Sequence, residues 1–360
     1  MDEKYAAAGL RRLREYGITI GSLPPGRLNG IGDVPGVRVG HLTLSEGAIQ
    51  TGVTAIVPHE GNLFQEKLEA AMHVINGFGK SAGLMQVAEL GSIETPIILT
   101  NTLSVGAAAT GLVRFMLAAN PDIGVDTGTV NPLVFECNDG YLNDIRGLHV
   151  KEDHVAMAIA AATEAVEEGS VGAGTGMSCY GLKGGIGTAS RRFALDGRDR
   201  HLGVLVLTNM GRLADLVVDG RPLGRDIAAR RAERDGAARD QGSIIVIIAT
   251  DAPLDARQLG RLCRRAEVGI ARTGNMLSGG SGEIALAFST AYRIPHYPAA
   301  DSMHRQVIHE DKLDLLFRAL IESVEEAILN SMLASPACVG RDGHKRESLG
   351  ELCGGFIKRS

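Results

Sequence analysis

Short apolar runs bounded by turn residues recur along this chain, and they predict its strands. Runs of about four to eight apolar residues between glycine, proline or asparagine are typical of strands that are buried on both faces. The stretch SIIVIIAT, for example, follows a long charged segment and is apolar at every position between its two ends. The predicted strands span residues 37–40, 53–59, 96–101, 133–139, 203–209, 243–250 and 283–290.

Longer stretches with apolar residues three or four positions apart predict helices. From Asp153 to Glu168 apolar residues recur at this spacing, and the Asp153 side chain is expected to cap the helix. After the strand 243–250 the chain turns at residues 251–255 and continues as a helix as far as Ile270. The predicted helices span residues 4–16, 65–75, 105–118, 153–168, 255–270 and 313–333.

The order of these elements predicts an α/β fold. Strands and helices alternate, but several neighbouring strands are joined by connections too short for a crossover helix. A mixed sheet or two stacked sheets therefore fit better than a doubly wound parallel sheet. The charged stretch from Arg212 to Gly242 is the best candidate for an internal boundary, and the chain shows no internal repeat.

Composition narrows the class of protein. The 360 residues suffice for one large domain or two ordinary ones, and 44% hydrophobic and 22% charged residues are typical of globular proteins. A net charge of −5 gives no reason to expect a nucleic-acid partner. The N-terminus lacks the apolar core of a signal peptide, no apolar run approaches bilayer-spanning length, and the five cysteines form no CxxC pair. We therefore expect a cytoplasmic protein with no membrane partner.

The glycine clusters do not match nucleotide-binding motifs. NGFGKS at 76–81 ends like a Walker A loop, but Val74 stands where its first glycine would be. GAGTGM at 172–177 and GGIGTAS at 184–190 do not match GxGxxG, so these glycines make tight turns or let backbone N–H groups face a substrate. With no HExxH among the ten histidines and no GxSxG elbow, the sequence predicts neither a metal nor a cofactor.

The Gly242-Ser243 pair at the start of one strand has two interpretations. In the first, the pair is an ordinary turn at the start of a strand. In the second, it is a peptide bond that the protein cuts itself. If the bond is cut, Ser243 gains a free α-amine with a reference pKa of about 8, so nucleophile and base belong to one residue. The glycine suits this chemistry because it permits the backbone geometry needed for attack on its own carbonyl.

A second candidate lies in SGGSGEIALAF at 278–288, where Ser281 and Glu283 come just before a strand. Residues two apart on an extended chain point the same way, so the hydroxyl and the carboxylate are expected to face one space. The alternative is a turn with a solvated glutamate, and spacing alone favours that alternative.

Six stretches together resemble the DmpA-type aminopeptidases, the family of L-aminopeptidase/D-esterases and β-peptidyl aminopeptidases. They occur in the order that the family has, from near the start of the chain into its final third. The matching stretches are IGDVPGVRVGH (31–41), NGFGKSAGLMQVAELGSIETPIILTNTLSVG (76–106), ECNDGYLNDI (136–145), GAGTGMSCYGLKGGIGTASR (172–191), GSIIVIIATDAPL (242–254) and SGGSGEIALAFSTA (278–291).

The resemblance implies a self-processing N-terminal-nucleophile hydrolase with a four-layer αββα sandwich, that is, two stacked mixed sheets flanked by helices. A single domain, 1–360, is then expected to split between Gly242 and Ser243 into an α chain, 1–242, and a β chain, 243–360. The two chains are expected to stay together in a homo-oligomer, for which a tetramer of αβ units is one arrangement. The implied substrates are small peptides, amino-acid amides or esters.

The resemblance also implies roles for five side chains. Ser243 matches the nucleophile, and Ser281 and Glu283 match a pair beside it that would hold the Ser243 hydroxyl or amine and the substrate ammonium. Asn209 matches an asparagine of the oxyanion hole, and Tyr141 matches an active-site tyrosine that donates to the tetrahedral intermediate or lines the pocket.

Two alternatives stay open. Acyltransferases and oligoamide hydrolases of the same fold also cut themselves, but they use threonine as the nucleophile. The other alternative is an uncut relative that binds a small molecule in the same glycine-lined cleft and has no activity. Neither the preference for L-α, D or β amino acids nor the base for the first cut can be derived from the residues.

Overall fold

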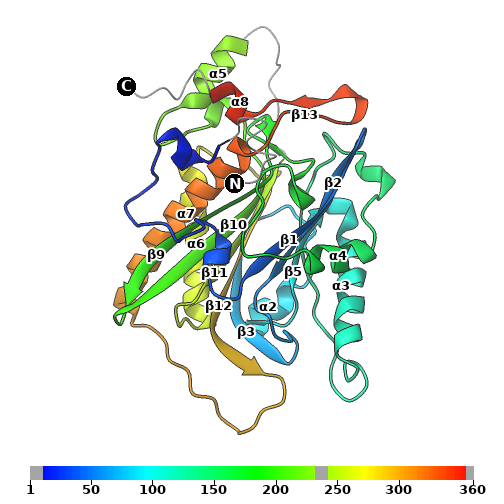
Figure 1. Ribbon diagram of the computed structural model, residues 1–360, viewed down its shortest axis with the longest axis vertical. Helices are drawn as coiled ribbons and strands as arrows, with labels where there is room; N and C mark the ends of the chain where they lie inside the picture. The colour runs from blue at the N-terminus through cyan, green and yellow to red at the C-terminus, as the bar shows by residue number, and fades with distance from the viewer. Residues whose placement is uncertain (1–10, 232–241, 354–360) are drawn as a thin grey trace.

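Two sheets stacked face to face form the centre of the protein, and helices cover both outer faces (Figure 1). The computed structural model describes residues 11–231 and 242–353. In Figure 1, helices α6 (Ala256–Arg272) and α7 (Leu313–Leu333) lie on one side of the sheets. Helices α3 (Val105–Ala119) and α4 (Asp153–Ala160) lie on the other side. The four-layer αββα sandwich and the α/β class are therefore confirmed.

The larger sheet is mixed and contains the strand that begins at Ser243. β11 runs parallel to β12 on one side and antiparallel to β10 on the other. Its six strands lie in the order β4 (Ser92–Ile93), β3 (Glu66–Gly77), β12 (Gly282–Pro295), β11 (Ser243–Thr250), β10 (Arg198–Asn209) and β9 (Ile186–Leu195).

The smaller sheet is also mixed. Its parallel pair, β5 and β6, is joined through helix α3, whereas β1 and β2 form a hairpin. Its four strands lie in the order β1 (Arg38–Glu46), β2 (Ile49–Val57), β5 (Ile97–Asn101) and β6 (Leu133–Cys137).

The alternation of side chains along β11 shows how the layers are built. Ile244, Val246 and Ile248 belong to the core between the large sheet and helices α6 and α7. Ile245 and Ile247 belong to the core between the two sheets. A strand that is apolar at every position is thus required, because both of its faces are buried.

The remaining elements are short. Two small hairpins matter for the candidate site: one pairs β7 (Ser178–Cys179) with β8 (Leu182–Lys183), and the other pairs β13 (Cys338–Val339) with β14 (Lys345–Arg346). The other helices are α2 (Leu84–Leu90), α5 (Leu223–Arg231) and α8 (Leu349–Cys353), with short 3-10 helices that include Leu13–Tyr16 and Gly172–Gly174.

One helix prediction is wrong, a second is too long, and a third is only partly described. Residues 65–75 form strand β3, because pairing with β12 and β4 outweighs a local pattern that suits a helix. Helix α4 ends at Ala160 rather than Glu168, and its N-cap is Glu152, so Asp153 does not cap it. The predicted helix 4–16 begins in residues outside the described ones. The other predicted strands and helices are present, although β1, β10 and β12 extend five or six residues beyond their expected bounds.

Helix α3 contradicts one further expectation from the sequence. With the turn before it, the segment Thr102–Ala119 has a mean hydropathy of 1.4 over 18 residues and is long and apolar enough to cross a membrane. The expectation that no apolar run reaches such a length is therefore wrong. A single helix of this kind is weak evidence for a membrane, and here α3 packs on β5, β6 and α4 as part of an outer layer.

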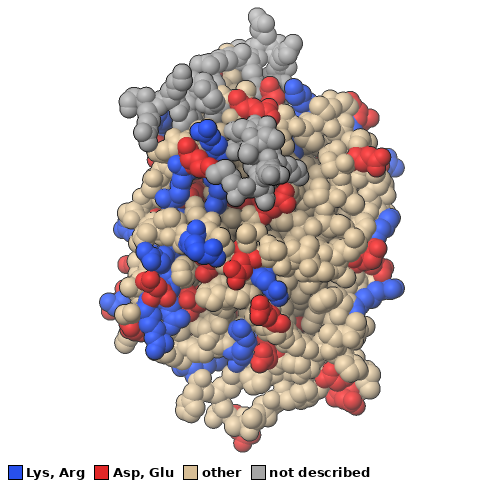
Figure 2. All heavy atoms as spheres, viewed as in Figure 1, with Lys and Arg blue, Asp and Glu red and all other residues tan. Residues whose placement is uncertain are grey.

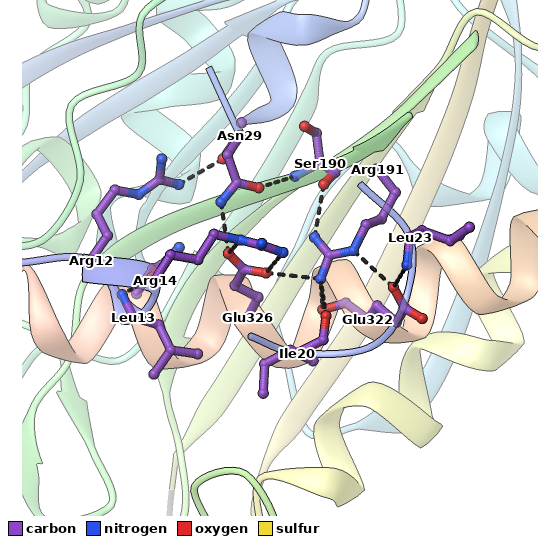
Figure 3. Close-up of polar contacts among 12 residues, drawn as sticks. Arg12, Leu13, Arg14, Ile20, Leu23, Asn29, Ser190, Arg191, Glu322 and Glu326 are labelled. Carbon is purple, nitrogen blue, oxygen red and sulfur yellow. Dashed lines mark hydrogen bonds and ion pairs between the residues drawn. The ribbon is translucent and has the colours of Figure 1, made fainter. Parts of the chain in front are cut away.

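A buried ion network ties α7 to segments near the start of the chain (Figure 3). Arg191, fully buried on β9, donates to the carboxylates of Glu322 at 2.9 Å and Glu326 at 2.8 Å. Arg14 also pairs with Glu326, at 2.7 Å. Burial alone would raise the pKa of Glu326, but the hydrogen bond from Arg14 and the charge of Arg191 hold it below its ordinary value.

Small residues allow the close approach of β9 and α7. A Cβ atom on Gly187 would lie 2.0 Å from the carbonyl oxygen of Ala327, so only glycine fits there.

On the face drawn in Figure 2, acidic and basic side chains are interspersed. Such a mixed surface is typical of globular proteins.

Candidate active site

Ser243 is the first residue of β11 and lies between the ends of two other strands. In the ladders it pairs with Asn209 of β10 on one side and with Gly282 of β12 on the other. The side chain of Ser243 is buried, and its Oγ accepts a hydrogen bond from the Gly282 N–H at 3.2 Å. The same N–H also approaches the Gly242 carbonyl oxygen, at 3.3 Å.

The residue before Ser243 has to be small. A Cβ atom on Gly242 would lie 1.9 Å from the carbonyl oxygen of Asn209 and 2.6 Å from Cα of Met210. The Gly242–Ser243 bond therefore lies close against the end of β10. This packing is a sufficient reason for a glycine at position 242. The presence of the glycine therefore does not distinguish an ordinary turn from a processing site.

The Asn209 carboxamide is held in one orientation. Its Oδ1 accepts the backbone N–H of Ser178 at 2.8 Å, and its Nδ2 donates to the carbonyl oxygen of Asn138 at 2.9 Å. An amide nitrogen carries two N–H groups, so one donor is available besides the one used for Asn138. Asn209 can therefore present a fixed N–H next to Ser243.

Ser281 and Glu283 flank Gly282, and both are fully buried. The solvated glutamate is therefore excluded. Within the described residues the Ser281 Oγ has no hydrogen-bond partner, while its carbonyl oxygen accepts from the side-chain amide of Asn76. That the hydroxyl of Ser281 and the carboxylate of Glu283 face one space stays a prediction.

A carboxylate that was not singled out in the sequence, Glu136, lies at the same edge. It is buried on β6, where Oε1 accepts the Lys80 N–H at 2.8 Å and Oε2 accepts the Thr102 hydroxyl. Burial raises the pKa of the neighbouring Cys137 well above its ordinary value, and the charges of Glu136 and Glu283 raise it further. A charged residue in the otherwise apolar run LVFEC is the signal that would have found it.

The loop between β3 and α2 contacts both Glu136 and Gly282, the residue of β12 that pairs with Ser243. A Cβ atom on Gly282 would lie 2.9 Å from the carbonyl oxygen of Phe78 and 3.2 Å from Ser243 Oγ. Two residues further on, the Lys80 N–H donates to Glu136. The stretch NGFGKS is therefore a wall of the candidate site rather than a phosphate loop.

Tyr141 lies in the loop after β6, and its side chain is 39% exposed. Its ring stacks on His344, with 4.6 Å between the ring centroids, and the guanidinium carbon of Arg346 lies 3.5 Å from the ring centroid. The loop also carries Asn138, whose carbonyl oxygen binds Asn209. His344 and Arg346 lie beyond residue 291, where the last of the six stretches that carry the resemblance ends.

The loop also contains a buried acid, Asp139, and a buried lysine, Lys183, lies on β8. Burial raises the pKa of Asp139 to about 7 and lowers the pKa of Lys183 to about 7. Asp139 accepts from the Asn143 side chain at 3.0 Å, and the Lys183 Nζ donates to the carbonyl oxygens of Gly174 and Gly184. Among the described residues, no group of three or more His, Cys, Asp or Glu side chains is placed to hold a metal ion.

Comparisons with known proteins find peptidases among the relatives of this chain. The family model of peptidase family S58 matches residues 29–346. A curated relative, the beta-peptidyl aminopeptidase BapA of Sphingosinicella microcystinivorans, is 37% identical over 365 residues, which cover 96% of this chain and 91% of the relative.

Solved structures of similar proteins match this chain over nearly its whole length. The PH0078 protein of Pyrococcus horikoshii OT3 is 52% identical with a TM-score of 0.90, and the match covers 95% of this chain and 97% of that chain. The L-aminopeptidase D-Ala-esterase/amidase of Ochrobactrum anthropi, described as a prototype of the serine aminopeptidases and a variant of the Ntn hydrolase fold, is 37% identical with a TM-score of 0.87. That match covers 94% of this chain and 95% of that chain.

Proposed function

Because this chain belongs to peptidase family S58 and is an aminopeptidase with the Ntn hydrolase fold, we propose that Ser243 becomes its N-terminal nucleophile by self-cleavage. The observation that carries the proposal is the position of Ser243, which is buried at the start of a central strand beside the fixed carboxamide of Asn209. The domain 1–360 then consists of an α chain, 1–242, and a β chain, 243–360.

The proposed cut uses the Ser243 hydroxyl, the Gly242 carbonyl and one water. Ser243 Oγ attacks the carbonyl carbon of Gly242, the C–N bond breaks, and the hydroxyl proton passes to the departing amine. An ester then joins Gly242 to Ser243. Water then hydrolyses the ester, which leaves a carboxylate on Gly242 and restores the Ser243 hydroxyl. The free α-amine has a reference pKa of about 8 and can accept the hydroxyl proton in the next reaction.

Turnover repeats this chemistry on a peptide or amide substrate. Ser243 attacks the carbonyl carbon of the N-terminal residue, the leaving amine departs, and water releases the acyl group from the ester. Asn209 and Tyr141 donate to the developing oxyanion. Glu283 and Glu136 supply negative charge for the substrate ammonium, and Ser281 orients the hydroxyl or the amine of Ser243.

The remaining assignments are also proposals. The names of the relatives make N-terminal β-amino acids and L-amino acids the first substrates to test. We place the protein in the cytoplasm, without a cofactor, as a homo-oligomer such as a tetramer of αβ units. Exposed apolar side chains on and beside α3, namely Leu103, Leu117, Leu148 and Met157, are available for contacts between copies.

An intact mass spectrum of the wild-type protein beside Ser243→Ala tests the proposal. We expect two masses from the wild type, whose sum equals the full chain plus one water, and a single uncut mass from the variant. Ser243→Ala should also fail to hydrolyse aminoacyl p-nitroanilides. A single full-length mass for both proteins would overturn self-cleavage and favour the uncut binding protein, and transfer of the acyl group to an added amine in place of water would favour the acyltransferase.

A further inference from the structure

The short C-terminal hairpin of β13 and β14 contacts Tyr141, one of the proposed oxyanion donors, and Ser178, which binds the other, Asn209. We propose that Arg346, on β14, is a positioning residue that holds Tyr141 directly and Asn209 through Ser178. The proposal rests on the proposed function, because it assigns Arg346 to the same reaction.

The first contact is with the ring of Tyr141. The guanidinium carbon of Arg346 lies 3.5 Å from the ring centroid, within the range of a cation–π interaction. The same ring stacks on His344 with 14° between the ring planes, and a hydrogen bond of 2.7 Å joins the His344 Nδ1 to the Tyr141 carbonyl oxygen. A ring held by both residues cannot swing freely, although it is partly exposed to solvent.

The second contact leads to Asn209. The Arg346 Nε donates to the Ser178 hydroxyl at 3.1 Å, and the Ser178 backbone N–H donates to Asn209 Oδ1 at 2.8 Å. One side chain therefore connects the tyrosine and the asparagine that are proposed to bind the same oxyanion. Their relative placement matters, because donors stabilise an oxyanion only when they are already in position.

The hairpin is itself fixed at both sides. The Arg341 N–H donates to the carbonyl oxygen of Leu142 at 2.8 Å, and the Lys183 N–H donates to that of Glu347 at 2.9 Å. Arg346 is thus presented from a strand that is bonded to the Tyr141 loop and to β8. If the chain is cut after Gly242, the β chain supplies Arg346 while the α chain supplies Tyr141, Ser178 and Asn209.

The residue type matters for this role. A planar guanidinium can lie over a ring and donate through Nε at the same time, whereas a lysine ammonium is a point charge that cannot do both in one geometry. Arg346→Met removes the stacking, the hydrogen bond and the charge. Arg346→Lys keeps the charge alone.

The test compares Arg346→Met with Lys345→Met. Lys345 is exposed and adjacent in the chain, so its replacement removes the same charge from the same hairpin. We expect Arg346→Met to lower kcat roughly tenfold to hundredfold with KM little changed, because misplaced donors weaken the transition state. Arg346→Lys should restore only a minor part of the kcat that Arg346→Met loses. Lys345→Met should have the kcat of the wild type. Equal kcat for Arg346→Met and Lys345→Met, or full recovery by lysine, would overturn the proposal.

A double-mutant cycle with Tyr141→Phe separates positioning from a general loss of structure. If Arg346 acts through Tyr141, the two changes together should cost less in kcat than the product of the single effects. Multiplicative effects, accompanied by a fall in Tm for Arg346→Met alone, would show a merely structural role. Activity that survives in Ser243→Ala would refute the proposed function itself, whatever Arg346 does.

Discussion

Asn209 and Ser243 are register partners across the antiparallel pair of β10 and β11. Asn209 is the last residue of its strand and Ser243 is the first of its own. The backbone ladder therefore sets the distance between the proposed nucleophile and the proposed oxyanion donor, and the bonds to Ser178 and Asn138 set the direction of the carboxamide. Such an arrangement is organised before any substrate arrives.

The first prediction concerns the packing of Gly242 in the uncut chain. In a Ser243→Ala background, Gly242→Ala should lower the free energy of unfolding by about 1–3 kcal/mol, because the new methyl group overlaps the backbone at Asn209 and Met210. Denaturant unfolding measures this change. Gly279→Ala is the matched control, since a Cβ atom there meets nothing within 4 Å. Equal stability of the two variants would contradict the close contact.

The second prediction concerns the donor of Asn209. Asn209→Asp keeps the size of the side chain and the acceptor for the Ser178 N–H, but it loses both N–H donors. We expect kcat to fall by about 10²–10³-fold, the usual cost of losing one oxyanion donor. Steady-state kinetics on an aminoacyl p-nitroanilide checks this, with intact mass to show whether the variant is still cut. A processed variant with normal kcat would remove Asn209 from the oxyanion site.

The third prediction concerns Glu136. Glu136→Gln should raise KM for substrates with a free amine by about tenfold to hundredfold, because a hydrogen bond to a charged group is lost. The control is Glu89→Gln, which removes an exposed carboxylate from α2 and should leave KM unchanged. If both variants bind substrate like the wild type, Glu136 has a structural role and Glu283 alone would face the ammonium.

The fourth prediction concerns the buried ion network around Arg191. Arg191→Met should cost about 3–5 kcal/mol of unfolding free energy, because Glu322 and Glu326 remain buried with less compensation. The next residue supplies the control: Arg192 forms an exposed pair with Asp199 at 3.3 Å, and Arg192→Met should cost about 0–1 kcal/mol. Urea unfolding of the uncut Ser243→Ala chain measures both. Similar losses of unfolding free energy in the two variants would mean that the buried ion network contributes little to stability.

The fifth prediction concerns pH. Burial lowers the pKa of His41 to about 4, so this histidine stays neutral in the folded protein between about pH 6.5 and 4, whereas the unfolded chain binds a proton there. Stability should therefore fall as the pH falls through this window, by at most about 1.4 kcal/mol per pH unit for one proton. His41→Gln should flatten this part of the profile. An unchanged slope would show that other groups cause the acid sensitivity.

Much of the fold could be predicted locally. The run SIIVIIAT is apolar at every interior position, and a strand buried between a helical layer and a second sheet requires this pattern. Residues 65–75 show the limit of such reasoning. Their local pattern suits a helix, but the open edge of β12 offers a ladder of backbone hydrogen bonds, and pairing with a distant strand outweighs local preference.

The sequence by itself determined the residue types, the alternating elements and the six stretches that resemble the DmpA-type aminopeptidases. Only the tertiary structure brought Asn209 opposite Ser243, put the carboxylate of Glu136 at the same edge, and laid Arg346 over Tyr141. The reason is physical. Periodicity reports which face of an element is buried, whereas contacts between residues far apart in the chain depend on how strands and layers pair.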